Sequence, residues 1–153
     1  MNTKPSLNPS ATVDDLAYQA RILPGVSRTF ALTIPVLPEK LARVMTNAYL
    51  LCRLADTIED DVGLEHAQKS EFHARFVAVV KGEEVVDPFV AELLPLLSER
   101  VLPAERDLVR NAAAVIRVTH SFSHDERAAL TRCVGVASQY MDRIDVQVVA
   151  GLG

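Results

Sequence analysis

The stretch of residues 46–61 places the strongest constraint on the fold of this chain. We expect it to form the C-terminal part of a long helix that begins near Pro38 and ends at Gly63, because proline suits a first helical turn and glycine a helix end. At about 100° per residue, four polar residues fall within an arc of roughly 60° on one side of this helix. They are Tyr49, Arg53, Asp56 and Asp60. The opposite side is apolar and consists of Val44, Leu51, Leu54, Ala55 and Ile58. The helix is therefore predicted to pack by one face and to present a polar stripe on the other.

Acidic residues crowd the end of this predicted helix. They are Asp56, Glu59, Asp60 and Asp61. Negative charges near a helix C-terminus oppose the macrodipole at a cost of about 0.3–1 kcal/mol each, and like charges four residues apart repel one another. One interpretation is a solvated surface on which Arg53 pairs with Asp56 or Asp60. The other is a cation site that offsets both penalties.

The available ligands select the kind of cation. Carboxylate oxygens without histidine or cysteine favour a hard ion. Mg²⁺ keeps several waters and is typically held by one or two carboxylates together with substrate phosphates. Because Arg53 and Tyr49 lie beside Asp56 and Asp60, the stripe favours a site at which a Mg²⁺-bound diphosphate completes the coordination shell.

Three motifs, in this order and spacing, resemble the opening of the squalene/phytoene synthase family. They are Ser27-Arg28-Thr29-Phe30, Ala48-Tyr49-Leu50-Leu51-Cys52-Arg53 and Asp56-Thr57-Ile58-Glu59-Asp60-Asp61. The last motif is more similar to the squalene synthase branch than to the phytoene synthase branch, in which a pair of aspartates usually opens it. The resemblance is close over residues 15–65. In the remainder of the chain it is limited to helical character.

The resemblance implies an all-α helical bundle of the isoprenoid synthase type and a head-to-head prenyl transfer. Two farnesyl diphosphates would condense with Mg²⁺, and NADPH would then reduce the cyclopropyl intermediate to squalene. Two alternatives stay open. One is a phytoene synthase-like condensation, and the other is a non-catalytic helical module that retains a Mg²⁺-diphosphate half-site.

The resemblance also implies roles for individual residues. Asp56 and Asp60, assisted by Glu59, would bind the metal. Ser27, Arg28 and Arg53 would hold phosphate oxygens. Tyr49 would assist the movement of a proton or of diphosphate, and Phe30 would face the carbocation. These roles assign Tyr49, Arg53 and Phe30 to catalysis.

Helical patterns dominate the remainder of the chain. Residues 1–11 are predicted to be a disordered leader, and residues 12–153 a single all-α domain. The first helix is expected to end at Leu23, before Pro24. Further helices are expected at 65–81, 87–97 and 103–119, with a short helix or turn at 27–35 and a last helix after a capping box at Ser123 and Glu126.

Family members carry a second acidic motif on a later helix that faces the first. Here Asp145-Val146-Gln147-Val148 stands where tyrosines are expected, before a Val-Ala-Gly segment that resembles the family's. We therefore expect an incomplete bundle, the N-terminal half of a larger isoprenoid synthase fold. The second wall of the site would come from a missing C-terminal half or from self-association, and the 153-residue chain alone is not expected to complete the reaction.

Composition restricts partners and compartment. A net charge of −4 gives no basis for binding nucleic acid. No apolar run is long enough to span a membrane, and the N-terminus does not resemble a signal peptide. Cys52 and Cys133 are predicted to be buried free thiols, and His66 and His73 to lie on the surface. We expect a cytoplasmic protein that can associate peripherally with a membrane.

Overall fold

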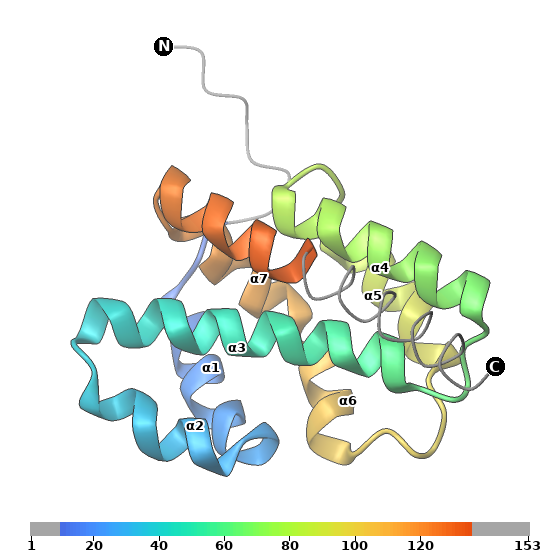
Figure 1. Cartoon of the computed structure of the whole chain (residues 1–153), viewed down its shortest axis with the longest axis horizontal. Helices are drawn as coiled ribbons and strands as arrows, with labels where there is room; N and C mark the ends of the chain where they lie inside the picture. The colour runs from blue at the N-terminus through green and yellow to red at the C-terminus, as the bar shows by residue number, and fades with distance from the viewer. Residues whose placement is uncertain (1–9, 136–153) are drawn as a thin grey trace, which may run out of the picture.

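The computed structural model describes residues 10–135, and over this range the fold is all-α (Figure 1). In chain order its elements are α1 (Val13–Val26), α2 (Arg28–Thr33), the 3-10 helix η1 (Ile34–Val36), α3 (Glu39–Asp60), α4 (His66–Lys81), α5 (Val86–Leu93), the 3-10 helix η2 (Leu94–Leu96), α6 (Pro103–Arg110) and α7 (Ala112–Ser121). Residues 124–135 are also helical. Most of the predicted leader (residues 1–9) and the segment 136–153, with Asp145, lie outside the described residues.

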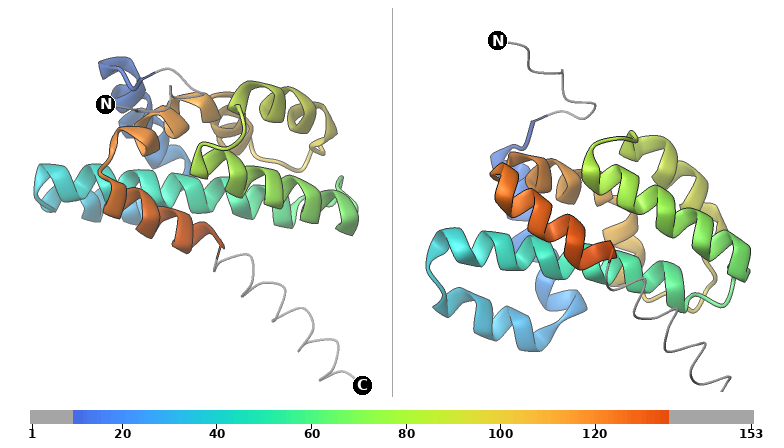
Figure 2. Two further views of the ribbon diagram at one scale, coloured as in Figure 1. Left: turned by 90° about the horizontal axis from the view of Figure 1, so that it is seen from above. Right: turned by 45° about the horizontal axis from the view of Figure 1, so that its top comes forward.

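Helix α3 is the long central element, and four other helices, α1, α4, α6 and α7, pack against it (Figures 1 and 2). It begins directly after Pro38 and ends at Asp60, close to the predicted bounds. Helix α4 runs alongside its C-terminal half, and α1, α6 and α7 also contact it. The helix is therefore surrounded on its apolar side, and the prediction of a single packing face is confirmed.

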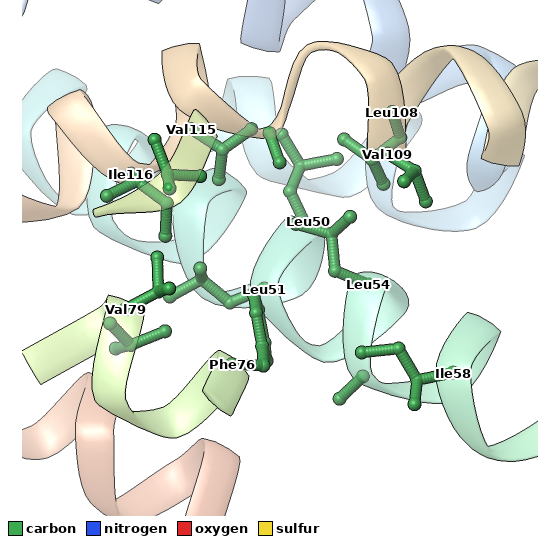
Figure 3. Packing of buried hydrophobic residues seen from close by; sticks show 14 of the residues in the cluster. Leu50, Leu51, Leu54, Ile58, Phe76, Val79, Leu108, Val109, Val115 and Ile116 are labelled. Carbon is green, nitrogen blue, oxygen red and sulfur yellow. The ribbon is translucent and has the colours of Figure 1, made fainter. Parts of the chain in front are cut away.

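The core forms where the apolar face of α3 meets α4, α6 and α7. Figure 3 shows side chains of these four helices pointing toward one another: Leu50, Leu51, Leu54, Ile58, Phe76, Val79, Leu108, Val109, Val115 and Ile116. All ten are at most 2% exposed to solvent. Burial of a side chain of this size stabilises the fold by roughly 1.5–3 kcal/mol. The apolar face of α3 therefore orients the whole helix.

A buried polar network fixes the position of α3 relative to α1 and α7. Asn47 is fully buried, and its side-chain amide donates to Gln19 Oε1 at 2.7 Å and to the Val115 carbonyl at 3.0 Å. The Thr119 hydroxyl donates to Asn47 Oδ1 at 2.9 Å. Because unpaired buried polar groups are costly, these bonds favour one register of the three helices.

The C-terminal end of α3 is tied to the segment before α6. Ser98 donates to the Asp61 carboxylate through its hydroxyl and through its backbone N–H, the latter at 3.0 Å. Arg106 Nη2 donates to the Ser98 carbonyl at 2.7 Å, which extends the link into α6. A Cβ atom at Gly63 would lie 3.0 Å from the Leu96 carbonyl oxygen, so this close approach favours glycine. Asp61 thus has a structural role.

Helix α1 runs past Pro24, so the predicted end at Leu23 was wrong. It continues to Val26, and the Ser27 N–H donates to the Leu23 carbonyl at 2.8 Å. Proline lacks one backbone donor, but in the last turn this removes a single hydrogen bond and does not prevent the next one. Gly25 then packs against α6, where an added Cβ would lie 3.3 Å from Ala104 Cβ.

The predicted helix at 103–119 is divided in two at Asn111. This residue has φ −106° and ψ 22°, outside the helical range, and separates α6 from α7. Its side-chain amide donates to the Asp107 carbonyl at 2.9 Å, which also accepts from the hydroxyl of Tyr18. Side-chain bonds of this kind compete with the helical ladder.

The other helix boundaries largely confirm the local signals. Gly82 ends α4 with φ 84°, a left-handed conformation that favours glycine. Ser123 and Glu126 form the predicted capping box through reciprocal bonds of 3.1 and 3.2 Å. The helix predicted at 87–97 changes to 3-10 form at Leu94, next to Pro95.

Two predictions of exposure were wrong. His73 is only 7% exposed, because the buried face of α4 is wide enough to include it beside Phe72 and Phe76. Cys52 and Cys133 are free thiols, but Cys52 is half-buried and Cys133 is exposed. No helix between residues 10 and 135 combines the length and the apolar character needed to cross a bilayer.

We predict that Ile58→Ala will lower the free energy of unfolding by about 2–4 kcal/mol, because it opens a cavity beneath α3. Ile58 is 1% exposed, whereas Val62 on the following turn is 65% exposed. Val62→Ala is the matched control and should change stability by less than about 0.5 kcal/mol. Urea denaturation of both variants is the measurement, and similar values for the two would contradict the packing described above.

We also predict that Asp61→Asn will destabilise the protein at neutral pH by about 1–3 kcal/mol, because it weakens a buried hydrogen-bonded contact. Burial alone would raise the pKa of Asp61, but the bonds from Ser98 hold that pKa below its ordinary value. The stabilisation is therefore complete above the unfolded-state pKa of about 3.9 and is lost as the pH falls through the lower folded-state pKa.

The control for this prediction is Asp60→Asn, which removes a charge from the same helix end without removing a partner. It should leave stability unchanged or raise it slightly. Denaturation between about pH 7 and pH 2 should show the gap between wild type and Asp61→Asn closing in acid. A gap that stays constant with pH would rule out the ionised carboxylate as its origin.

Candidate functional site

The polar stripe of α3 lies opposite its buried face, and its first member is Tyr49. The Tyr49 hydroxyl donates to the Val26 carbonyl at 3.1 Å, which holds the end of α1 against α3. The ring of Phe30 from α2 packs on the ring of Tyr49 with 4.6 Å between centroids. The structure therefore brings Phe30 and Tyr49 together, one turn before Arg53.

Arg53 pairs with a residue that the sequence analysis did not identify. Its Nη2 lies 2.5 Å from Oε1 of Glu105, which is on α6. The Thr57 hydroxyl lies 3.5 Å from the second oxygen of Glu105 and donates to the Arg53 carbonyl at 3.0 Å. One interpretation of the sequence was a solvated surface on which Arg53 pairs with Asp56 or Asp60, and the structure shows that this pairing is wrong.

Glu105 carries no local signal for this role. It lies 52 residues from Arg53 along the chain, in the first turn of α6. Acidic residues are common in a first helical turn because they favour the macrodipole. Only the packing of α6 against α3 places the Glu105 carboxylate on the polar stripe.

Asp56 and Asp60 continue the stripe toward the end of α3. Neither carboxylate forms a side-chain hydrogen bond or an ion pair with any residue in the range 10–135. Asp56 is half-buried and Asp60 is exposed. Partial burial raises the pKa of Asp56, the carboxylates of Asp60 and Glu105 raise it further, and Arg53 opposes them. The two aspartates thus form a local concentration of negative charge without a protein counter-ion of their own.

Glu59 points to a different side of α3. Its Oε1 lies 3.9 Å from Nδ1 of His73 on α4, and its carbonyl accepts a bond from Lys69 Nζ at 2.6 Å. The structure therefore does not bring Glu59 together with Asp56 and Asp60. Within residues 10–135, no three His, Cys, Asp or Glu side chains are grouped as metal ligands. A third ligand role for Glu59 stays a prediction.

Ser27 and Arg28 lie at the start of α2. The Ser27 hydroxyl accepts from the Phe30 N–H at 3.2 Å, so it caps this short helix. Arg28 is exposed to solvent. The bond between Tyr49 and Val26 keeps this segment beside the first turn of the stripe.

A hollow of about 190 Å³ opens beside the acidic end of the stripe. Its lining residues include Thr57, Asp60, Arg100 and Glu105. A larger hollow of about 730 Å³ lies between the starts of α1 and α3 and the loop after α7, and it contains none of the predicted site residues. Chemistry therefore favours the smaller hollow as part of the site, although the other has more space.

The arrangement suits a ligand that is both anionic and able to bring a cation. Arg53 provides a fixed positive charge, and Asp56 and Asp60 provide oxygen ligands one helical turn apart. A diphosphate that carries a hard divalent ion would meet both requirements. Phe30 and Tyr49 extend the same face with aromatic surface.

Comparison with known proteins agrees with this geometry. The family model for squalene/phytoene synthase matches residues 23–131, which include all three motifs and Glu105. Searches of curated proteins and of solved structures gave no match. The matched region covers more than half of the chain, and the all-α structure agrees with the isoprenoid synthase fold of the family. The chain therefore belongs to the squalene/phytoene synthase family.

Proposed function

We propose that this protein is a squalene synthase-like transferase. It would condense two farnesyl diphosphates head to head with Mg²⁺ and reduce the product to squalene with NADPH. Membership of the family supports head-to-head prenyl transfer. The choice of squalene, and with it NADPH, depends on the resemblance of residues 56–61 to the squalene branch. The observation that carries the proposal is the pair of unpartnered aspartates beside Arg53.

The residues present fit a Mg²⁺ site that a substrate completes. Asp56 and Asp60 offer only carboxylate oxygens, which suit a hard ion, and one or two carboxylates plus substrate phosphates are its usual shell in such sites. Bound Mg²⁺ would neutralise charge on the departing diphosphate. Glu59 would join the pair only after its side chain leaves the side of α3 that faces α4.

The remaining side chains would hold and shield the substrate. Arg53 and Arg28 would donate to phosphate oxygens, and the Ser27 hydroxyl would accompany Arg28. The faces of Phe30 and Tyr49 carry negative electrostatic potential, so they would stabilise an allylic cation formed beside them. The Tyr49 hydroxyl, which donates to the Val26 carbonyl in this structure, would assist the movement of a proton or of diphosphate.

Two diphosphates require two acidic walls, and the stripe of α3 supplies one. We propose that the second wall comes from a partner chain that carries an acidic helix motif. A non-catalytic module that retains the half-site is the alternative function. Exposed apolar side chains on α2 and η1 favour it, because Leu32 and Val36 are 78% and 82% exposed and could support self-association.

The proposal predicts that the protein binds farnesyl thiodiphosphate far better with Mg²⁺ than without it. The double variant Asp56→Ala, Asp60→Ala should lose this enhancement, with affinity in Mg²⁺ falling by at least about tenfold. Titration calorimetry with and without a chelator measures both effects. Geranylgeranyl thiodiphosphate serves as a second ligand, and tighter binding of this C20 chain would favour the phytoene synthase-like alternative.

The matched control removes two acidic residues elsewhere, as Glu83→Ala, Asp125→Ala. Both are exposed and lie outside the stripe. This variant should bind like wild type, because two distant surface charges are largely screened at physiological salt. Equal binding by wild type and the Asp56, Asp60 variant would remove the metal assignment.

We further predict that the 153-residue chain alone forms neither squalene nor its cyclopropyl intermediate. The carbocation must be enclosed away from water, and the stripe of α3 lies at the surface with Asp60 exposed. Incubation with farnesyl diphosphate, Mg²⁺ and NADPH, followed by extraction of the products, is the measurement. Turnover would show that a second copy or a segment outside residues 10–135 supplies the opposing wall.

A further inference from the structure

The partner of Arg53 determines whether the aspartates of the stripe are available. On an isolated helix, Arg53 would face Asp56 three residues further on, and pairs at this spacing attract one another. In the structure Arg53 instead contacts Glu105 on α6 at 2.5 Å. Asp56 and Asp60 are thereby left without an ion pair within residues 10–135.

Arg53 also retains donor capacity beyond this contact. A guanidinium has five N–H donors, and the contact with Glu105 uses Nη2. Its Nε is buried without a partner in the described part of the chain. The side chain as a whole is 30% exposed, so solvent and ligands can reach part of it, although not the buried Nε. Glu105 thus restrains the guanidinium without occupying all of it.

Glu105 is itself held in place. Its side chain is only 15% exposed, and the Thr57 hydroxyl lies beside its second oxygen. Helix α6 is fixed by the bond between Arg106 and the Ser98 carbonyl and by the contact of Ala104 with Gly25. A carboxylate restrained in this way can hold a partner in one orientation.

We propose that Glu105 is a positioning residue that keeps Arg53 turned away from Asp56. Asp56 and Asp60 then stay available to a divalent cation, and the remaining N–H groups of Arg53 stay available to a diphosphate. This inference rests on the proposed function, because it assigns the stripe to a Mg²⁺-bound diphosphate. Glu105 acts through Arg53 and needs no contact with the ligand.

If Glu105 acted on the ligand only through its charge, its removal would change ligand affinity in the opposite direction. Its negative charge repels an anionic ligand, so its removal would tighten binding if repulsion dominated. Positioning predicts weaker binding, because a released Arg53 pairs with Asp56 and withdraws both groups from the ligand. Variants of Glu105 that change its charge and its side-chain length separately distinguish repulsion from positioning.

The experiment is a double-mutant cycle on Arg53 and Glu105. Wild type, Arg53→Ala, Glu105→Ala and the double variant are titrated with farnesyl thiodiphosphate in Mg²⁺. Glu105→Ala should weaken binding about tenfold when Arg53 is present. In the Arg53→Ala background the same change should leave affinity unchanged or improve it, because no arginine remains to be positioned.

Two further variants test reach against charge. Glu105→Gln keeps an acceptor oxygen at the same distance and should restore most of the affinity. Glu105→Asp keeps the charge but is one methylene shorter, so it should behave like Glu105→Ala. The control is Glu92→Ala, which removes an acidic partner from Arg75 away from the stripe. Thermal melts check that each variant is folded at the titration temperature. If Glu105→Ala is unfolded, the comparison of Glu105→Gln with Glu105→Asp provides the test.

The outcomes separate this inference from the proposed function. If wild type binds in Mg²⁺ but Glu105→Ala and Glu105→Asp bind equally well or better, the positioning role is overturned and the proposed function stands. Equal weakening by Glu105→Ala with and without Arg53 would also overturn it, since the effect would not pass through Arg53. Absence of Mg²⁺-dependent binding by wild type would remove both proposals.

Discussion

Burial of one face of α3 is the constraint on which the remaining structure depends. Leu50, Leu51 and Ile58 are almost completely removed from water by α4, α6 and α7. Because the helical repeat is 3.6 residues, this burial also determines which residues appear on the other side. Tyr49, Arg53 and the aspartates are displayed in line because their apolar neighbours are held inside. The burial that packs this helix therefore also determines which side chains form the candidate site.

The carboxylates at the acidic end of α3 differ in whether the protein itself provides a partner for them. Asp61 accepts two bonds from Ser98, and Glu59 turns toward α4, where His73 lies 3.9 Å away. These two side chains contribute to the packing of the helices around them. Asp56 and Asp60 have no such compensation within residues 10–135, and they retain the electrostatic cost of a helix C-terminus. A bound cation would offset this cost, as the proposed Mg²⁺ site requires.

Helix α6 gives the site a component from a distant part of the chain. Its position depends on the Asp61–Ser98 contact, on Arg106 and on the close approach of Gly25 to Ala104. The same helix delivers Glu105 to Arg53. A structural carboxylate at the end of α3 therefore helps to organise the electrostatics of the stripe two turns earlier. Substitutions in the contact between Asp61 and Ser98 would therefore alter the stripe without removing a ligand contact.

The sequence alone determined the all-α class, the bounds of α3, its polar stripe, the end of α4 at Gly82 and the capping box at Ser123. These features depend on periodicity and on bonds between residues a few positions apart, so the local sequence is enough to predict them. Only the tertiary structure decided the burial of His73, the direction of Glu59 and the pairing of Arg53 with Glu105. Each of these depends on which helix packs alongside, and a one-dimensional pattern does not specify a contact between residues 52 positions apart.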